Sequence, residues 1–476
     1  MSLYEIYRPP TPRFENVNPF SIDECSFCPS FHLTTEHFPL QINEPHANSP
    51  IHDFPFDLDE FDRMFIDHDA HGMVSETCMN MHTSLILPFQ GMEVDNHLSL
   101  LNLIVAYAEV MDRNQEITGL SEVIGRSIIK KVNPFGGPTE RVLYMFQHHN
   151  KKSNYNYLKE ESFKNFYPAF KAFYQIFPYG KFAHFVANSA IMESLPSDAE
   201  IIHLIDFDIG EGVQWASFIE AIKHRCTEVR VTSIKFDEKD ESSPFRFEDT
   251  KRRLHDHAWS YGLNAIVEEV RFQDLEIFTN NIEKGDYGRK SLYVFNCHVA
   301  LPHMGRVRSK KHVFKFLRVA ENFLHQVTCW GSTTSKGIIT YGNGDVFYDK
   351  TTTLMSYSTF LDANIAHYQA LLESMEFDFP KHLGEARRAL ECLFVGPSVS
   401  SIVRDRKWEE IRQCGEIEFG LGLDGLELSE ASVDEAKEVV KEGVSLYGVR
   451  IESGKKNEMV IEWNGISIVR VCCWKS

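Results

Sequence analysis

The sequence predicts an α/β fold whose mostly parallel sheet is closed by terminal antiparallel strands. Residues 200–208 form a near-continuous apolar run, which is typical of a strand buried on both faces of a parallel sheet. From residue 213 to residue 341, apolar strand patterns alternate with helical patterns, and this alternation favours a parallel sheet. Between residues 446 and 472, two turn sequences separate three strand patterns, which predicts antiparallel pairing.

An acidic segment precedes this fold. Residues 1–95 contain 16 acidic and 3 basic side chains, so they carry −13 of the chain's formal charge of −19. They show no apolar periodicity, and we expect a disordered tail. Within it, residues 54–65 alternate acids with bulky apolar groups. This composition is typical of disordered activation segments, although a packed strand or short helix fits it equally well.

The rest of the chain is only mildly acidic, with a formal charge of −6. These totals show no strongly basic DNA-binding surface, although a local basic patch is compatible with them. No apolar run approaches the ~18 residues of a membrane span, so we expect no membrane association. The 10 cysteines follow no regular framework, which favours reduced thiols in the cytosol or nucleus.

A helical region follows the tail. Its apolar residues recur at helical spacing, and the Asn-Pro-Phe-Gly-Gly-Pro sequence at 133–138 interrupts them. We expect one domain over 97–476, with a largely helical cap at 97–195 and an α/β core at 196–476. The expected helices of the cap span 98–111, 121–132, 138–149 and 163–174.

The α/β core is predicted from strands that alternate with helices. The expected strands span 200–208, 229–234, 264–270, 291–297 and 337–341, and the expected helices span 213–224, 247–261, 311–324 and 361–373.

The C-terminal part of the core begins with a helix and ends with strands. A capping box from Ser432 to Glu435 is expected to open a helix that runs to about residue 441. An Asn-Gly turn at 464–465 is expected between the last two strands. The closing strands are expected at 446–451, 459–463 and 466–472. This order of elements is similar to that of a methyltransferase-type Rossmann fold.

A glycine turn joins the first strand of the core to its first helix. Asp208, Gly210 and Gly212 lie in this turn, where glycines let a ligand approach the backbone at a helix N-terminus. In S-adenosylmethionine-dependent methyltransferases a third glycine follows, but here Gln214 stands at that position and Trp215 comes next. Both side chains would crowd a cofactor. We therefore favour a degenerate turn without a cofactor over a methyltransferase or small-molecule site.

Other patterns for catalysis or metal binding are weak. The spacing of Cys25, Cys28, His32 and His37 is too compact for a zinc finger, which has about 12 residues between its ligand pairs, so no metal site is expected. The chain contains neither G-x-S-x-G nor H-E-x-x-H, and no P-loop lysine motif occurs. We therefore predict no catalytic residues.

The densest basic run is formed by Arg306, Arg308, Lys310 and Lys311. It could contact nucleic-acid phosphates or serve as a nuclear import signal. The solvated start of a helix explains the run at least as well.

Several ordered motifs lie in residues 97–476. A stretch from Leu98 and residues 250–262 are similar to two leucine-rich regions, and Trp463 and Trp474 lie in a segment similar to a terminal SAW motif. A VHIID motif is matched by Ile202, His203, Leu204, Ile205 and Asp206. On these motifs the chain resembles the GRAS (scarecrow-like) family of plant transcriptional regulators. Residues 210–215, 391–395 and 435–440 resemble its nodulation-signalling branch.

Two family motifs are matched poorly. The RVER signature is missing around residues 386–404, and the PFYRE motif is matched only in part. Roles that the family assigns to those two segments are therefore not transferred.

The resemblance implies a nuclear, non-enzymatic regulator of transcription, with the cytoplasm as a second location. It implies a hetero-oligomer with another GRAS protein, or a homodimer, acting on promoter DNA directly or through that partner. The branch implies root symbiosis, both nodulation and mycorrhiza, and strigolactone-related gene expression. Direct sequence-specific DNA binding is the alternative, followed by small-molecule binding or methyl transfer. The family places partner binding on the helical region, where the candidates, which also fit a cap core, are Leu100, Leu101, Leu103 and Tyr107.

Overall fold

The computed structural model describes residues 91–113, 118–133, 135–147, 166–236, 246–285, 289–299, 308–329, 336–344, 346, 356–404, 423–452 and 457–476. Residues 102–476 belong to one compact unit, and the sheet lies in it. Of the acidic tail that we predict over residues 1–95, residues 1–90 lie outside the described residues, and these include residues 54–65 and the Cys-His cluster. No described helix is long and apolar enough to cross a membrane.

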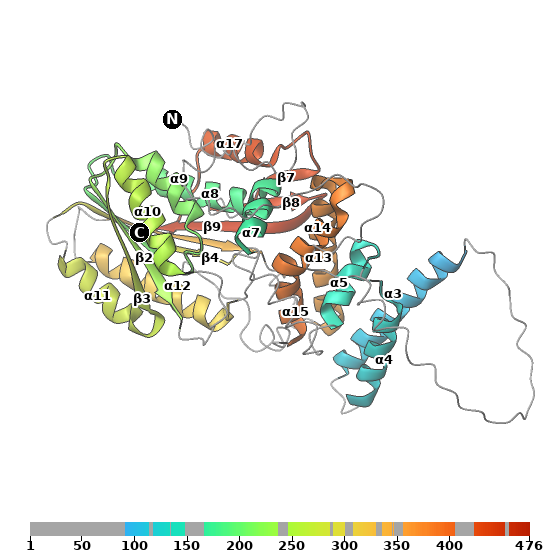
Figure 1. Ribbon diagram of the computed structural model, residues 1–476. Coiled ribbons are helices and arrows are strands. Elements are labelled where there is room, and N and C mark those ends of the chain that lie inside the picture. Colours follow the sequence, from blue (N-terminus) through green and yellow to red (C-terminus); the bar gives the residue numbers. More distant parts are fainter. Residues whose placement is uncertain are drawn as a thin grey trace, which may run out of the picture. The chain divides into compact units, whose positions relative to one another are not determined.

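The sheet has a parallel half and an antiparallel half (Figure 1). In its described part the strands follow the order β3-β2-β1-β4-β5-β9-β8-β7, and β6 pairs with β9. The parallel strands are β1 (Ile201–Asp206), β2 (Glu228–Lys235), β3 (Asn264–Arg271), β4 (Ser291–His298) and β5 (Lys336–Asn343). The others are β6 (Asp424–Gly425), β7 (Tyr447–Ile451), β8 (Glu458–Trp463) and β9 (Ile466–Lys475).

This topology confirms the predicted fold class. The order β3-β2-β1-β4-β5 is that of a Rossmann-like sheet, and β9 joins β5 in the antiparallel direction. All residues of β1 and β4 are buried, because helices cover both faces of the sheet at its centre.

Helices of the parallel half lie on both sides of the sheet (Figure 1). α9 (Val213–Ile222) and α10 (Phe247–Ser260) cover one side, and α11 (Leu275–Gly285) and α12 (Lys310–Cys329) cover the other. The core on the α12 side is aromatic. In it the ring centroid of Phe295 lies 5.5 Å from that of Phe323 and 6.0 Å from that of Phe316.

The helical region forms as predicted, with two differences. Its helices are α3 (Gly91–Asp112), α4 (Thr118–Lys131), α5 (Pro138–Gln147), α7 (Phe166–Ile176) and α8 (Pro178–Ser194). α3 begins within the stretch that we assign to the tail. α8 was not predicted as a separate helix, and it packs directly on β5 and β9 of the sheet.

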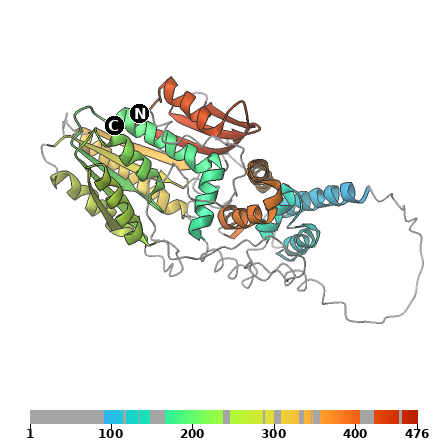
Figure 2. The same ribbon diagram turned by 45° about the horizontal axis from the view of Figure 1, so that its top comes forward.

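Four more helical elements follow β5. They are α13 (Tyr357–Asp378), α14 (Gly384–Leu390), a π-helix (Glu391–Val395) and α15 (Gly396–Arg404), with short 3-10 turns at Phe272–Asp274 and Lys381–Leu383 elsewhere in the chain. Only the first of them was predicted. α13 and α15 pack against α5, as Figure 2 also shows. Helices that precede β1 in the sequence and helices that follow β5 therefore form one helical layer.

The predicted capping box is wrong by three residues. The N-cap of α17 (Glu430–Val440) is Ser429, whose Oγ accepts a hydrogen bond from the backbone N of Ser432 at 3.2 Å. Ser432 is therefore the third helical residue, because the cap pattern starts one turn earlier. The Asn-Gly turn is confirmed, since Asn464 (φ 48°) and Gly465 (φ 82°) both have the positive φ of a type I′ turn.

β7 is the last strand of the sheet in its described part. Side chains cover backbone donors along its outer edge. The N–H of Val449 donates to Glu442 Oε1 at 3.2 Å, and the N–H of Tyr447 donates to Ser445 Oγ at 3.3 Å.

Candidate functional site

The glycine turn lies where β1 and β4 end. In open α/β sheets, ligands bind at this point, where the strand order reverses. Gly210 (φ 54°) and Gly212 (φ 72°) are in the left-handed conformation that favours glycine. A Cβ atom on Gly212 would lie 3.0 Å from Thr250 Cγ2 and 3.1 Å from Leu254 Cδ1. The close approach that glycine permits is therefore used by side chains of α10.

Asp206, the last residue of β1, is buried, with 3% of its surface exposed. Its Oδ1 accepts a hydrogen bond from the backbone N of Asp208 at 2.8 Å. Its Oδ2 accepts from Trp215 Nε1 at 2.7 Å and from Asn296 Nδ2 at 2.9 Å. Burial raises the pKa of Asp206 to about 7, although the three donated hydrogen bonds act in the opposite direction. This carboxyl group is engaged by protein groups.

Gln214 extends the same hydrogen-bond network. Its Nε2 donates to Asn188 Oδ1 at 3.2 Å and to Asn296 Oδ1 at 3.1 Å, and its Oε1 accepts from Asn296 Nδ2 at 3.1 Å. Thr340 Oγ1 also donates to Asn296 Oδ1, at 2.8 Å. The network joins α8, α9, β4 and β5, and a satisfied buried network of this kind rigidifies the core around it.

Arg308 closes the turn from the other side. Its Nε donates to Asp208 Oδ2 at 2.8 Å, and the two side chains are 7% and 9% exposed. The guanidinium also lies over the ring of Phe236, 4.2 Å from the ring centroid. We named Arg308 as a candidate for nucleic-acid contact or nuclear import, with the solvated start of a helix as the alternative. Neither suits this residue, because its side chain is buried in an internal ion pair.

The outer side of the turn is held by α10. Glu211 forms an ion pair with Arg253, and Thr250 Oγ1 donates to the carbonyl of Gly210 at 2.9 Å. Burial raises the pKa of Glu211, and the nearby Arg253 acts against that rise.

These contacts do not fit a bound nucleoside cofactor at this place. Trp215 is fully buried, Gln214 is 5% exposed, and the acids of the turn pair with protein groups. The expectation that bulky residues at 214 and 215 crowd the turn matches this geometry. The same two residues also form its hydrogen-bond network, which the sequence did not indicate.

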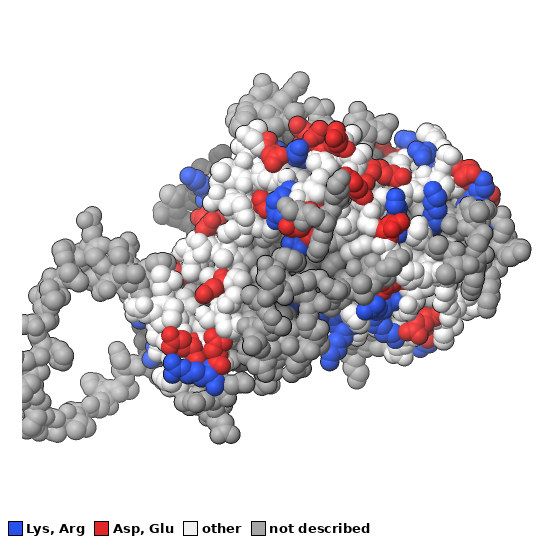
Figure 3. All heavy atoms as spheres, turned by 180° about the vertical axis from the view of Figure 1, so that it is seen from behind, with Lys and Arg blue, Asp and Glu red and all other residues white. Residues whose placement is uncertain are grey.

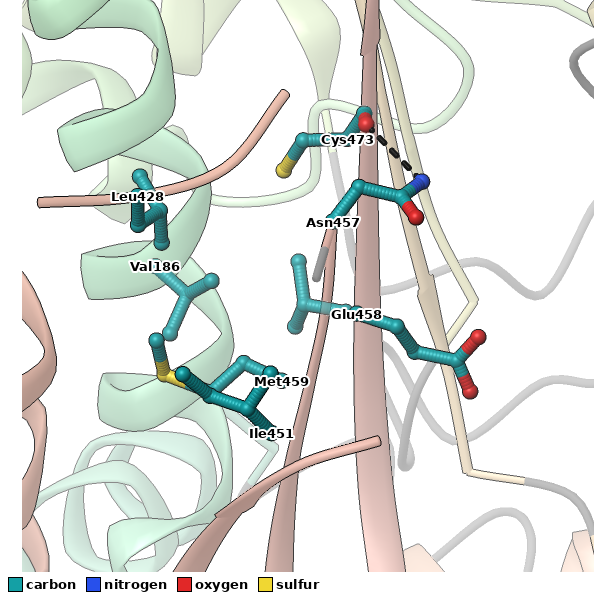
Figure 4. Close-up of a pocket in the computed structure, with 8 residues that line it drawn as sticks. Val186, Leu428, Ile451, Asn457, Glu458, Met459 and Cys473 are labelled. Carbon is teal, nitrogen blue, oxygen red and sulfur yellow. Dashed lines mark hydrogen bonds between the residues drawn. The ribbon is translucent and has the colours of Figure 1, made fainter. Parts of the chain in front are cut away.

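A small pocket lies elsewhere, beside α8, β8 and β9 (Figure 4). Its lining is mostly apolar, and the carboxylate of Glu458 points away from it. The space is about 10 Å³, which holds about one water molecule. It is lined by Val186, Leu428, Ile451, Asn457, Glu458, Met459, Val471 and Cys473. A small-molecule site needs far more room.

The other VHIID residues belong to the core. Ile202, Leu204 and Ile205 are at most 1% exposed. The ring of His203 stacks on that of Tyr293 with a centroid distance of 4.9 Å. His203 is 3% exposed and therefore also belongs to the core, so the motif lies at the centre of the sheet.

The four helical candidates, all on α3, differ in exposure. Leu100 is 3% exposed and Leu101 is 40% exposed, while Leu103 and Tyr107 are intermediate. The ring of Tyr107 meets that of Tyr357 edge-on at 6.2 Å, and burial raises the pKa of its hydroxyl. Of the four, Leu101 is the most available to a partner.

The remaining basic candidates lie at the start of α12. Lys311 is exposed and Lys310 is partly buried, while Arg306 lies outside the described residues. The three described members of the predicted basic run thus differ in their environments.

The two tryptophans of the closing motif have structural neighbours. The ring centroid of Trp463 lies 4.8 Å from that of Tyr447 and 5.3 Å from that of Phe377. Trp474 is partly buried beside the aromatic core on the α12 side, and its backbone pairs with Ile339.

A buried ion cluster links α5 to the π-helix. Glu391, 1% exposed, pairs with Arg141 Nε at 3.0 Å and with Arg387 Nε at 3.2 Å. Both arginines also pair with Glu376, each at 3.3 Å. Burial raises the pKa of Glu391, and Arg141 and then Arg387 act against it. In the sequence, Glu391 stands out only as part of a segment that resembles the nodulation-signalling branch, because its partner Arg141 lies 250 residues away along the chain.

Metal-binding potential can be judged for the described residues alone. Among them, no group of three His, Cys, Asp or Glu side chains could hold a metal ion. The described cysteines, at positions 226, 297, 392, 472 and 473, form no disulfide bond.

Comparisons with known proteins agree with the fold and the motifs. The chain is 30% identical over 314 residues to Protein NODULATION SIGNALING PATHWAY 2 of Medicago truncatula, covering 64% of this chain. It is 28% identical over 313 residues to the protein of the same name in Lotus japonicus, again covering 64% of this chain. Each match spans 58% of the relative's length.

A solved structure and a family model extend the comparison. The crystal structure of SCL7 in Oryza sativa aligns with a TM-score of 0.55 at 18% identity, covering 78% of this chain and 99% of that one, which supports the fold. The model of the GRAS domain family matches residues 100–475. The chain therefore belongs to the GRAS domain family.

Proposed function

We propose that this protein is a non-enzymatic regulator of plant transcription that works in the nucleus through complexes with another GRAS protein at promoters. One observation carries the non-enzymatic part. The place where a Rossmann-like sheet would hold a cofactor contains Trp215, Gln214 and the Arg308–Asp208 ion pair. Substrate and cofactor would have no room next to the strand ends. We therefore expect the protein to act by binding other macromolecules at its surface.

The process that it regulates is proposed from its relatives. Two of them are named for nodulation signalling. We propose that this chain acts in root symbiosis, in nodulation and mycorrhiza, and affects strigolactone-related gene expression. A loss-of-function line that nodulates and is colonised normally would contradict this assignment.

Partner binding is assigned to α3. Leu101 and Val105 are 40% and 54% exposed and stand four residues apart, so they share one stripe of the helix. Two exposed apolar side chains on one stripe suit a helix of a second GRAS protein. Leu101→Ser should weaken that complex in a pull-down, and Leu120→Ser, on α4 and 42% exposed, is the matched control.

Direct DNA binding is the second candidate. The exposed Lys311 at the start of α12 supports it. On the described surface in Figure 3, however, acidic and basic side chains are interspersed, whereas a DNA-binding face gathers basic ones. This favours DNA contact through a partner.

Fluorescence anisotropy on a labelled promoter fragment separates the two candidates. The chain alone should bind weakly and without sequence preference, and addition of a GRAS partner should produce saturable binding. Tight binding by the chain alone, with a steep salt dependence, would establish direct DNA recognition.

The methyltransferase alternative has its own test. A ligand that binds the native state raises the melting temperature by mass action. S-adenosylmethionine at millimolar concentration should leave the melting temperature unchanged, and a clear rise would reopen the enzymatic alternative.

A further inference from the structure

Asp112, the last residue of α3, carries the wrong charge for its own helix. The C-terminal end of a helix is the negative end of its dipole, where basic side chains stabilise the helix and acidic ones do not. The last turn of α3 contains no basic residue, and both Glu109 and Asp112 lie in it. An acid that its own helix disfavours indicates that it serves a tertiary contact.

α13 has the complementary deficiency at its start. The first backbone N–H groups of a helix have no acceptor within that helix, and an acidic side chain near them is stabilising. The first turn of α13 contains no acidic residue. Its N-cap Ser356 accepts a hydrogen bond from the N–H of Thr359 at 3.0 Å. The N–H groups of Tyr357 and Ser358 therefore need acceptors from another part of the chain.

The carboxylate of Asp112 supplies both acceptors. Its Oδ1 accepts a hydrogen bond from the N–H of Tyr357, and its Oδ2 accepts from the N–H of Ser358 at 3.2 Å. With the bond to Ser356, the N–H groups of the first three residues of α13 are all satisfied. The negative charge of Asp112 also lies at the positive end of the α13 dipole, where it is favourable.

A second contact lies beside this cap. The ring of Tyr107, on the same helix as Asp112, meets the ring of Tyr357 edge-on with the centroids 6.2 Å apart. Tyr357 is 6% exposed, so its N–H, which Asp112 accepts, belongs to a buried residue. The last two turns of α3 are therefore fixed to the first turn of α13 at two points.

The exposed apolar stripe of α3 runs toward this anchor. Val105 precedes Asp112 by seven residues, which is about two helical turns, so both lie on one side of the helix. The neighbouring stripe, formed by Leu100, Ile104 and Ala108, is buried, and each of these residues is at most 5% exposed. Rotation of α3 about its axis would exchange the two stripes, and the bonds from Asp112 to α13 oppose that rotation.

We propose that Asp112 is the positioning residue of the partner-binding helix. Its carboxylate fixes the C-terminal end of α3 on α13 and so presents Leu101 and Val105 to the partner. The proposal rests on the proposed function, which names α3 as the helix that binds a second GRAS protein. Both carboxylate oxygens accept from α13, so Asp112 acts through the orientation of α3 rather than through contact with the partner.

Hydrogen exchange on the full chain, read by mass spectrometry, tests the anchor without a partner. Asp112→Ala should raise the exchange rates in α3 and in the first turn of α13 by about tenfold, because two N–H groups lose their acceptor. Asp112→Asn should restore most of the protection, since asparagine caps a helix about as well as aspartate. Amides of β1 and β4 should stay protected throughout, which shows that the sheet is intact.

Two controls separate positioning from a general loss of stability. Glu109→Ala removes another carboxylate of α3, which is 60% exposed and pairs only with Arg113 at 3.8 Å, and should leave the rates in α3 within about twofold. Arg308→Met weakens the core elsewhere, and local opening of α3 keeps that site folded. It should therefore also leave the rates in α3 within about twofold.

A pull-down titration with the GRAS partner links the anchor to binding. Asp112→Ala should raise the Kd by about tenfold, because a loosened helix must be ordered again when the partner docks. Asp112→Asn should keep the Kd within about threefold of the parent chain. This rescue by a variant that lacks the charge but keeps an acceptor is the result expected of a positioning residue.

Three outcomes would overturn the proposal. They are unchanged exchange in Asp112→Ala, an equal rise in Glu109→Ala, and a partner Kd that stays at the parent value while exchange in α3 rises. Leu101→Ser distinguishes these from a failure of the proposed function. If Leu101→Ser leaves the complex intact, α3 does not bind the partner, and the exchange rates alone decide whether Asp112 anchors the helix.

Discussion

The two halves of the sheet differ in which side chains are buried and which are exposed at their ends. At the carboxyl ends of β1 and β4, polar side chains are buried and satisfied by one another, as Asp206, Trp215 and Asn296 show. At the hairpin end of β7–β9, apolar side chains such as Val444 and Leu446 face solvent. The difference teaches that the edge where Rossmann-like sheets bind ligands is packed as core in this protein, while the antiparallel half exposes apolar side chains at its hairpin end.

The largest effect is expected for Trp215→Ala. The side chain is fully buried and donates to Asp206, so its loss leaves a cavity and removes a hydrogen bond. The free energy of unfolding should fall by about 4 kcal/mol in urea denaturation. Trp259→Ala is the matched control, since Trp259 is 76% exposed and its loss should change that free energy by less than about 0.5 kcal/mol. Equal losses in both variants would break the comparison.

Arg308→Met should have the next largest effect. It leaves the carboxylate of Asp208 buried without its ion-pair partner, which should lower the free energy of unfolding by about 3 kcal/mol. Lys311→Met removes an exposed charge from the same run and should cost less than about 0.5 kcal/mol. If Arg308→Met weakens only DNA binding and leaves stability intact, the run is a surface element after all.

Asp206→Asn should change how stability depends on pH. The pKa of Asp206 is about 7 in the folded state against 3.8 ordinarily, so the folded protein keeps a proton that the unfolded chain releases between these values. Its contribution to the free energy of unfolding therefore falls as pH rises through this window, by up to about 1.4 kcal/mol per pH unit. Urea denaturation between about pH 4 and pH 7 should give a shallower decline for the variant. Parallel curves would show that Asp206 stays ionised throughout.

The smallest effect is expected at the hairpin end. Val444→Ser should change the free energy of unfolding by less than about 0.5 kcal/mol, because Val444 is 87% exposed. Thermal melts of the variant and the parent chain check this. A large loss would mean that this side chain stabilises the fold, and the contrast between the two ends would disappear.

Local patterns predicted most of the fold. β1 to β5 begin and end close to the predicted limits, because each combines an apolar run with a flanking turn. α8 was not predicted as a separate helix, because it is buried on nearly all sides and its sequence shows no amphipathic stripe. The helix at 430–440 was predicted, but its start was placed at Ser432 because Ser432 and Glu435 match the capping-box pattern. The actual N-cap is Ser429.

The site was harder to predict than the fold. Gly210, Gly212 and Trp215 signal a crowded turn by themselves, since glycine conformation and side-chain bulk are local properties. The Arg308–Asp208 pair joins residues 100 positions apart, and nothing near Arg308 distinguishes it from its exposed neighbour Lys311. Tertiary pairing of this kind has no signature in a single sequence.

Glu442 and Ser445 have a consequence for the chain at high concentration. An uncovered strand edge is a template on which further chains add and aggregate. On β7 these two side chains occupy the backbone donors of Val449 and Tyr447. Two of the backbone donors on the edge of β7 are thus unavailable to a neighbouring copy of the chain. This disfavours edge-to-edge pairing and fibril growth at the end of the sheet where apolar side chains are exposed.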